Sequence, residues 1–436
     1  MTAGTGAGLN SDTIFAPASG AGRAALTVLR ISGPASGGLL AALCGHRPAP
    51  RAATLMRLRA PDGETLDRAL VLWFPGPASY TGEDAAELHL HGGRAVLEGV
   101  AEALVAGGAR PAEPGEFTRR AFLNGKLDLL AAEAIADLVD AETSAQRRQA
   151  LRQMEGGLGT LYRDWSARLL HLLAQQEALI DFPDEDLPPE VEAAGQAEAA
   201  ALMAEMQAHL ADGGRGERLR EGLVFAITGA PNVGKSTLIN AIAGRDVAIV
   251  SPMPGTTRDV LEARVVLGGV PVTLLDTAGL RETPDPIEAE GVRRARDRAA
   301  TADLVIALSD ATEAGLGGME VPGTLHVLNK IDLASLAHPF GISARTGAGL
   351  DQLRAHLAAE AVRLTAAAGP PPLTRARHRA AATEALGHLA AAAAAPLPEL
   401  RGEDLRLAMR ALGRLTGAIG VEDVLDSVFR QFCIGK

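Results

Sequence analysis

A glycine-rich segment at residues 229–236 (GAPNVGKS) stands directly between an apolar run at 223–229 and a helical run that begins STLINAIAG. Consecutive backbone N–H groups in such a loop, together with the start of a helix, favour phosphate oxygens. Lys235 is expected to reach the β and γ phosphates of a nucleotide, and Ser236 is expected to ligate magnesium. Because the strand before it and the helix after it are the context that this chemistry requires, the segment predicts a phosphate-binding loop rather than an ordinary turn.

Further motifs follow in the order that a guanine nucleotide site needs. GTTRD (255–259) puts the Thr257 hydroxyl where it can bind magnesium, and LLDTAG (274–279) puts Asp276 near the metal and the Gly279 N–H near the γ phosphate. In NKID (329–332), Asp332 offers a carboxylate to the two donors of the guanine edge, which adenine lacks. Ser343 and its neighbours are expected to close over the base. The predicted nucleotide-binding residues are Asn232, Val233, Gly234, Lys235, Ser236, Thr237, Thr256, Thr257, Asp276, Gly279, Asn329, Lys330, Asp332, Ser343 and Ala344.

The residue after Gly279 is Leu280, so no glutamine side chain there can orient the attacking water. Catalysis must use another group, and the stretch that follows offers Arg281, Glu282 and Glu288. A carboxylate could hold the water, whereas an arginine could neutralise charge in the transition state. Each could equally be a solvated loop charge, so the residues alone leave the choice open.

The elements that position these motifs belong to a multi-domain chain. Short apolar runs broken by Gly and Pro indicate an α+β fold from residue 12 to about 121, and apolar residues spaced by three and four over 151–172 indicate one helical face. Strand-like and helical runs alternate over 223–364, which predicts a Ras-like P-loop domain with a mostly parallel sheet. Linkers at 212–218 and 366–374 flank it, so a helical domain interrupted by an inserted α/β domain is the simplest interpretation. The expected divisions are an N-terminal α+β domain (1–121), the first part of an all-α helical domain (122–216), the inserted domain (217–366) and the second helical part (367–436).

The composition excludes several classes of protein. A net charge of −11 argues against a protein that coats nucleic acid or anionic membrane through a general basic surface, although a local basic patch is compatible with it. The only cysteines are Cys44 and Cys433, so neither a disulfide framework nor a cysteine-based zinc site is expected, and a cytoplasmic location is favoured. No stretch approaches the roughly 20 apolar residues of a membrane span, so we expect no membrane partner.

Lysine is rare, since only four of the 42 basic residues are lysines. This bias suggests that lysine persists where a compact ammonium is needed and a planar guanidinium does not fit. The alternative is that these four lysines persist by chance. The four are Lys126, Lys235, Lys330 and Lys436.

Three longer segments serve no general requirement of a GTP site: residues 77–93 (PASYTGEDAAELHLHGG), 114–143 (PGEFTRRAFLNGKLDLLAAEAIADLVDAET) and the terminal CIGK (433–436). With the phosphate-binding loop and NKID, they make the chain resemble the MnmE or TrmE family of tRNA modification GTPases over essentially its whole length. The resemblance implies a homodimer with a folate-binding N-terminal domain that takes 5-formyltetrahydrofolate or a related folate. It also implies an FAD-dependent flavoprotein partner of the MnmG or GidA type, and modification of carbon 5 of the wobble uridine in certain tRNAs.

The same resemblance implies ions at the nucleotide site. Asn232 matches a potassium-coordinating residue of the family, and potassium there would supply the charge that an arginine finger supplies elsewhere. A loop-stabilising hydrogen bond is the alternative role for Asn232. The implied metal ligands are Ser236 and Thr257 for magnesium, and Asn232, Ser251, Met253 and Thr256 for potassium.

Glu288 matches the family's water-orienting glutamate, with Glu290 as a near competitor. The catalytic residues implied by the motifs and the resemblance together are Glu288, Lys235 and Thr257.

For the folate, the family's positions map onto Arg30, Glu87, Lys126 and Lys436. A carboxylate can accept from the amide and amino donors of a pterin, and cations can hold the glutamyl carboxylates. The alternative for the two lysines is an ordinary solvated face.

These observations predict a cytoplasmic, potassium-stimulated GTPase that uses GTP, magnesium and folate in tRNA modification. One alternative is a ribosome-assembly GTPase that binds RNA without modifying it, which predicts a basic RNA-binding appendage. Another is a folate-sensing dimeric scaffold that hydrolyses GTP incidentally.

Overall fold

A computed structural model describes residues 12–20, 22–181, 189–244, 262–276, 301–312, 323–334, 338–366, 371–418, 425, 428–429, 432 and 434–435. The chain divides into two compact units, one made of Met1–Ala136 with Leu412–Lys436 and the other of Asp137–Ala411. Within the described residues, no helix is both long and apolar enough to cross a membrane. The predicted domain boundaries are not settled by this division and stay predictions.

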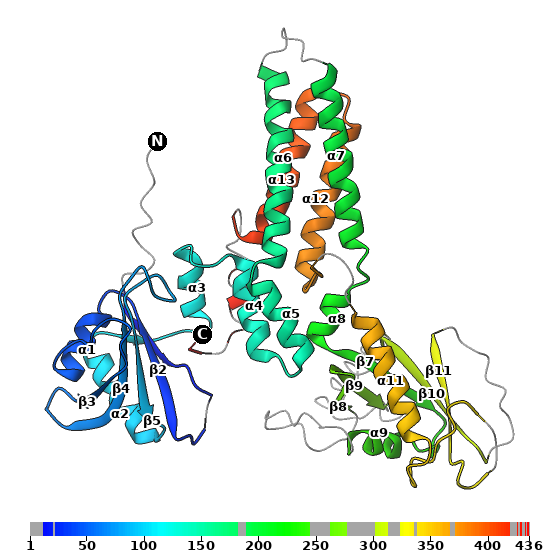
Figure 1. The fold of residues 1–436 in the computed structure, drawn as a ribbon, viewed down its shortest axis with the longest axis horizontal. Coiled ribbons are helices and arrows are strands. Elements are labelled where there is room, and N and C mark those ends of the chain that lie inside the picture. The colour runs from blue at the N-terminus through cyan, green and yellow to red at the C-terminus, as the bar shows by residue number, and fades with distance from the viewer. Residues whose placement is uncertain are drawn as a thin grey trace, which may run out of the picture. The chain divides into compact units, whose positions relative to one another are not determined.

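The first unit is built on a six-stranded sheet with the order β3-β4-β5-β2-β1-β6 (Figure 1). Apolar side chains on one face pack against two helices, α1 (Ser36–Cys44) and α2 (Arg94–Ala106), in a core that includes Leu29, Val71, Leu88 and Leu104. Each such fully buried side chain contributes about 1.5–3 kcal/mol. The strands are β1 (Ile14–Pro17), β2 (Leu26–Ser32), β3 (Thr54–Arg59), β4 (Thr65–Phe74), β5 (Ala85–His91) and β6 (Arg110–Pro111), followed by helices α3 (Glu116–Leu123) and α4 (Leu129–Asp140).

The second unit begins with helices, of which α6, α7, α12 and α13 run alongside one another in Figure 1. The apolar face predicted over 151–172 is divided between two helices, because one helix ends at Met154 and another begins at Gly157. Gly156 between them has a φ of 90°, which interrupts a right-handed helix and which glycine adopts without steric cost. The helices are α5 (Ser144–Met154), α6 (Gly157–Asp181), α7 (Pro189–Leu210), α8 (Arg215–Glu221), α12 (Ala376–Ala394) and α13 (Pro398–Thr416).

The chain enters and leaves the α/β part of this unit at neighbouring points. Asp212 precedes α8, and its carboxylate accepts hydrogen bonds from the Leu373 backbone N–H at 3.3 Å and from Arg379 Nη2 at 2.6 Å. The two segments are 161 residues apart in sequence. A single carboxylate therefore ties the incoming and the outgoing chain together.

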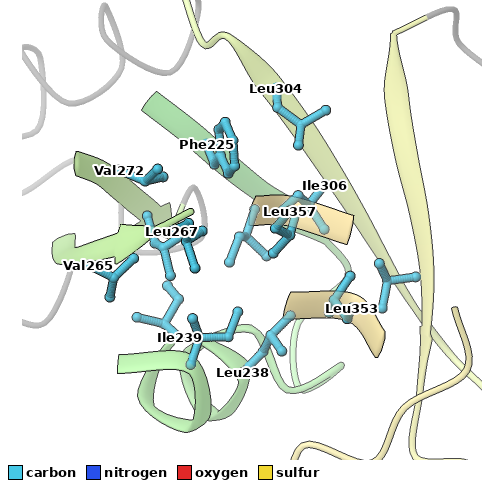
Figure 2. Packing of buried hydrophobic residues seen from close by; sticks show 14 of the residues in the cluster. Phe225, Leu238, Ile239, Val265, Leu267, Val272, Leu304, Ile306, Leu353 and Leu357 are labelled. Carbon is cyan, nitrogen blue, oxygen red and sulfur yellow. The ribbon is translucent and has the colours of Figure 1, made fainter. Parts of the chain in front are cut away.

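The α/β part has a five-stranded sheet with the order β11-β10-β7-β9-β8, parallel except for β8. Figure 2 shows Leu238 and Ile239 of α9 and Leu353 and Leu357 of α11 pointing into one apolar cluster with the sheet residue Phe225. This confirms the predicted Ras-like domain with a mostly parallel sheet. The elements are β7 (Leu223–Gly229), α9 (Lys235–Ala243), β8 (Glu262–Leu267), β9 (Val270–Asp276), β10 (Leu304–Asp310), β11 (Thr324–Asn329) and α11 (Leu350–Thr365).

Candidate nucleotide site

The carboxyl ends of the parallel strands bring four of the chemically active segments to one edge of the sheet. β10 pairs with β7 as far as Gly229 and with β11 as far as the partners Asp310 and Asn329, while β9 pairs with β7 as far as Asp276. β9 lies on one side of β7 and β10 on the other, so the direction of the crossovers reverses at β7. Ligands of open α/β sheets bind at such a reversal, beyond the carboxyl ends of the strands.

The phosphate-binding loop leaves β7 and enters α9 with two residues in the left-handed region, Asn232 (φ 63°) and Gly234 (φ 101°). A Cβ on Gly234 would lie only 2.4 Å from Asn329 Nδ2, so a side chain does not fit there. Lys235 is 5% exposed, and its Nζ donates to the carbonyl oxygens of Gly229 at 2.8 Å and Ala230 at 2.7 Å. The ammonium is therefore held inside the curve of the loop, where phosphate oxygens would approach.

The structure brings the predicted magnesium-site residues Ser236 and Asp276 into direct contact. Ser236 Oγ donates to Asp276 Oδ2 at 2.7 Å across 40 residues of sequence. Asp276 is buried at the end of β9, and Ser236 lies in the first turn of α9. Two hard oxygen donors at this spacing suit a magnesium ion that also binds phosphate.

Asn329 connects three of the predicted segments. Its Nδ2 donates to the Val233 carbonyl oxygen at 2.7 Å, and its Oδ1 accepts from the Ala344 N–H at 3.0 Å. The side chain is 3% exposed, so these hydrogen bonds are made away from water, where leaving them unmade would cost about 1–3 kcal/mol. Asn329 therefore fixes the phosphate-binding loop relative to the predicted base-binding segments.

The predicted base-reading residue Asp332 lies beside Ser343 and Arg345. A hydrogen bond from the Ser343 side chain, together with the charge of Arg345, holds the pKa of Asp332 below its usual value. The Arg345 Nη2 lies 3.1 Å from Asp332 Oδ2. The carboxylate is therefore ionised at neutral pH and able to accept hydrogen bonds from a base.

Asp310 also belongs to this site, although no motif in the sequence indicates it. It is 8% exposed at the end of β10, and its Oδ2 lies 2.5 Å from Lys330 Nζ. Lys330 has a φ of 65°, which is uncommon for a residue with a side chain. The hydrogen bond from Lys330, with further bonds from Thr312, lowers the pKa of Asp310 to about 2. The ion pair therefore fixes the Lys330 side chain next to Asn329 and Asp332.

The predicted folate residues Arg30 and Glu87 also meet in the structure. They are cross-strand partners on β2 and β5, and Arg30 Nε and Nη2 donate to Glu87 Oε1 at 3.1 and 2.9 Å. Both line a cavity of about 210 Å³. Lys126 is absent from the residues described around that cavity, but its Nζ donates to the Pro77 carbonyl oxygen at 3.1 Å, at the start of the loop that forms one wall.

The cavity has further polar walls that the sequence analysis did not identify. The Arg30 guanidinium lies over the Tyr80 ring at 5.3 Å, and the Tyr80 hydroxyl contacts Thr118 Oγ1 at 2.8 Å. Arg51 also lines the cavity and donates to the Ala78 carbonyl oxygen. Tyr80 stands within the PASYTGED motif, which could have indicated it, whereas no pattern in the sequence distinguishes Arg51.

Comparison with protein families decides the assignment. The model described as "MnmE helical domain" matches residues 129–433, and "GTP-binding protein TrmE N-terminus" matches residues 13–126. The chain belongs to the MnmE family of tRNA modification GTPases.

Curated members of the MnmE family are similar to it over nearly their whole length. The tRNA modification GTPase MnmE of Gluconacetobacter diazotrophicus is 64% identical over 97% of this chain and 98% of that protein, and the one of Granulibacter bethesdensis is 57% identical over 98% and 100%. Among solved structures, the FeoB G-domain from Methanococcus jannaschii is 27% identical over 32% of this chain and 97% of that one, with a TM-score of 0.23.

Several residues that the MnmE resemblance implicates lie outside the described part of the chain. They are Ser251, Met253, Thr256, Thr257, Gly279, Glu288 and Lys436. Their assignments stay predictions.

Asp310 provides a test by acid titration. Its pKa is lowered from 3.8 to about 2, so the ion pair with Lys330 stabilises the fold fully above about pH 4 and loses that effect as the pH falls toward 2. We expect Asp310→Asn to lower the melting temperature by a constant amount above pH 4 and by a shrinking amount below it. Thermal unfolding of both proteins between pH 2 and 6 measures this difference, and a constant gap across the range would contradict the assignment.

Proposed function

We propose that this chain is a potassium-stimulated GTPase that, with an FAD-dependent flavoprotein of the MnmG or GidA type and a folate one-carbon donor, modifies carbon 5 of the wobble uridine in certain tRNAs. We further propose a cytoplasmic homodimer with the four divisions 1–121, 122–216, 217–366 and 367–436. The observation that carries the proposal is the meeting of Lys235, Ser236, Asp276 and Asn329 at one sheet edge in a chain that belongs to the MnmE family.

Lys235 would stabilise the negative charge that develops on the β and γ phosphates, because its ammonium is already turned into the loop. Ser236 and Asp276 would hold magnesium, together with Thr257. Magnesium held there would supply positive charge that neutralises the charge developing on the phosphates. Glu288 is the proposed residue for orienting the attacking water, since no glutamine follows Gly279.

Asn232 is the proposed potassium ligand of the loop, with Ser251, Met253 and Thr256. Its left-handed backbone and its exposed side chain leave the amide oxygen available to a cation beside the phosphate-binding loop. Comparing GTP hydrolysis in potassium and sodium buffers of equal ionic strength tests this role. Faster turnover in potassium is expected, and equal rates would remove the cation from the mechanism.

The folate proposal rests on the cavity beside Arg30 and Glu87. Its wall combines a carboxylate, two guanidinium groups and the Tyr80 ring, which suits a flat heterocycle with amide and amino donors. Lys126 and Lys436 are the proposed partners of the glutamyl carboxylates.

Dimerisation is supported by the sheet face that α1 and α2 do not cover. Leu55 and Leu70 are cross-strand partners on this face, 60% and 43% exposed, and Leu26 is 58% exposed. Neighbouring apolar side chains of this kind mark contact surfaces between proteins. Arg30 and Glu87 alternate with the buried core residues of their strands and so belong to the same face.

Glu87→Gln is expected to weaken binding of 5-formyltetrahydrofolate about tenfold, because an amide is a poorer acceptor than a carboxylate and releases Arg30 from its ion pair. Isothermal titration with the folate measures the loss, with GTP affinity as the check on folding. Lys126→Ala should weaken the same binding. Folate affinity that is unchanged in both variants would mean that the pocket is misplaced.

Nucleoside analysis of tRNA tests the function as a whole. Cells that lack this protein should lose the wobble-uridine modification, and the full-length gene should restore it. Unchanged tRNA nucleosides would refute the proposed function.

A further inference from the structure

Helix α5 presents three arginines and no acidic residue in the sequence SAQRRQALRQM. Arg147, Arg148 and Arg152 are all exposed, and within the described part of the chain none of the three forms an ion pair or a side-chain hydrogen bond. Arg148 and Arg152 are four residues apart, so two like charges share one face of the helix and repel each other. Within the described residues, these guanidinium groups are therefore not neutralised by a carboxylate.

Other arginines of the same unit are used differently. Arg220 and Arg375 both donate to Asp137, at 2.9 and 2.7 Å, and Arg379 donates to Asp212 at 2.6 Å. In these cases a carboxylate neutralises the guanidinium and connects two segments. Among the described residues the α5 arginines have no such partner, which leaves their charge available to a ligand.

Arg148 and Arg152 line a hollow of about 600 Å³ between α5, the start of α6, α8 and the segment that follows α11. Its polar wall is held in place from behind: Gln149 Nε2 donates to the Gly216 carbonyl oxygen at 2.9 Å, and Thr374 Oγ1 donates to Gln153 Oε1 at 2.8 Å. Glu155 is the one carboxylate among the described lining residues. Two polar side chains of the hollow are therefore fixed by hydrogen bonds, and its described lining is positively charged overall.

We propose that this arginine face, Arg148 and Arg152 with the hollow beside them, binds the phosphate backbone of the tRNA. The proposal rests on the proposed function, because it names where the RNA substrate meets this chain. A protein with a net charge of −11 repels a polyanion at long range, so contact with RNA requires a place where positive charge is concentrated. Arginine also matches phosphate geometry through two parallel hydrogen bonds.

The face is distinct from the nucleotide site already described. Lys235 and its loop lie at the carboxyl edge of the sheet, whereas the arginine face lies on α5 and the residues lining its hollow include none of that loop. Phosphate contacts of this kind position an RNA without reading its sequence. Selection of the wobble uridine would then depend on other contacts.

The test compares the full-length protein with the double variant Arg148→Gln/Arg152→Gln. The probe is a fluorescently labelled tRNA transcript with uridine at the wobble position, and anisotropy is measured from 50 to 200 mM salt. We expect about tenfold weaker binding near physiological salt, and a slope of log K against log salt that is shallower by about 2, because two phosphate contacts are lost. The double change removes a like-charge pair and also the basic residue of the last turn of α5, which are small effects of opposite sign, so the variant should fold. Its melting temperature and GTP affinity check this.

The matched control is Arg94→Gln/Arg410→Gln, which removes the same charge from two exposed positions elsewhere. Equal tRNA affinity and salt slope in the control and the α5 variant would overturn the inference. A second probe is a poly-glutamate peptide: if the α5 variant loses binding to it and retains binding to tRNA, the face serves an acidic protein and the inference is wrong. Failure of the proposed function gives a different result, because the unaltered gene would then not restore the modified nucleoside.

Discussion

Replacing Asp332 by asparagine is expected to lower the affinity for GTP about a hundredfold and to raise the affinity for xanthosine triphosphate. In the proposed role the carboxylate would accept from the two donors of guanine, whereas an amide would present an N–H to one of them and leave that donor unpaired. Xanthine carries a carbonyl at that position and restores the match. Displacement of a bound fluorescent nucleotide by GTP, XTP and ATP measures the change in base preference from guanine to xanthine.

The control for this experiment is Asp310→Asn, which alters the neighbouring ion pair and leaves the base-reading carboxylate in place. Asp310→Asn should weaken the binding of GTP and of XTP to the same extent and keep the preference for guanine. A guanine preference that survives in Asp332→Asn would show that another group reads the base.

Lys235→Ala is expected to lower kcat for GTP hydrolysis about 10²–10³-fold, since it removes a charge aimed at the phosphates from a nearly buried position. Lys235→Arg should be almost as inactive, because a planar guanidinium cannot occupy the space between the Gly229 and Ala230 carbonyl oxygens. Single-turnover hydrolysis with saturating GTP measures the chemical step.

The arginine variant makes this prediction sharp. If Lys235→Arg hydrolysed GTP at the original rate, positive charge alone would suffice at this position. Lys235 would then not be retained because a compact ammonium is needed. Titration of both variants with GTP measures their nucleotide affinity. Unchanged affinity with slow hydrolysis indicates a lost catalytic contact, whereas lost affinity indicates a disrupted site.

The nucleotide loop could be predicted because its signals are local. A buried strand, glycines at 229 and 234, and a helix start stand within 15 residues of one another, and the contact of Ser236 with Asp276 follows once β7 and β9 are adjacent and parallel. Asp310 could not be found in this way. Its pairing with Lys330 depends on the register of β10 with β11 and on the left-handed backbone of Lys330, neither of which a residue pattern encodes.

The first unit shows the same limit. Arg30 and Glu87 are 57 residues apart, and they pair because the register of β2 with β5 sets them opposite each other. The break after Met154 also depends on backbone conformation, since apolar spacing continues through Gly156 although the helix does not. Periodicity identifies which face is buried, but it does not identify a residue with positive φ inside a helical pattern.

Asp212 holds the segment that enters the α/β part close to the segment that leaves it. If the α/β part were removed, the two chain ends would lie close enough for a few glycines to join them. Neighbouring points of entry and exit are what the insertion of one domain into another requires.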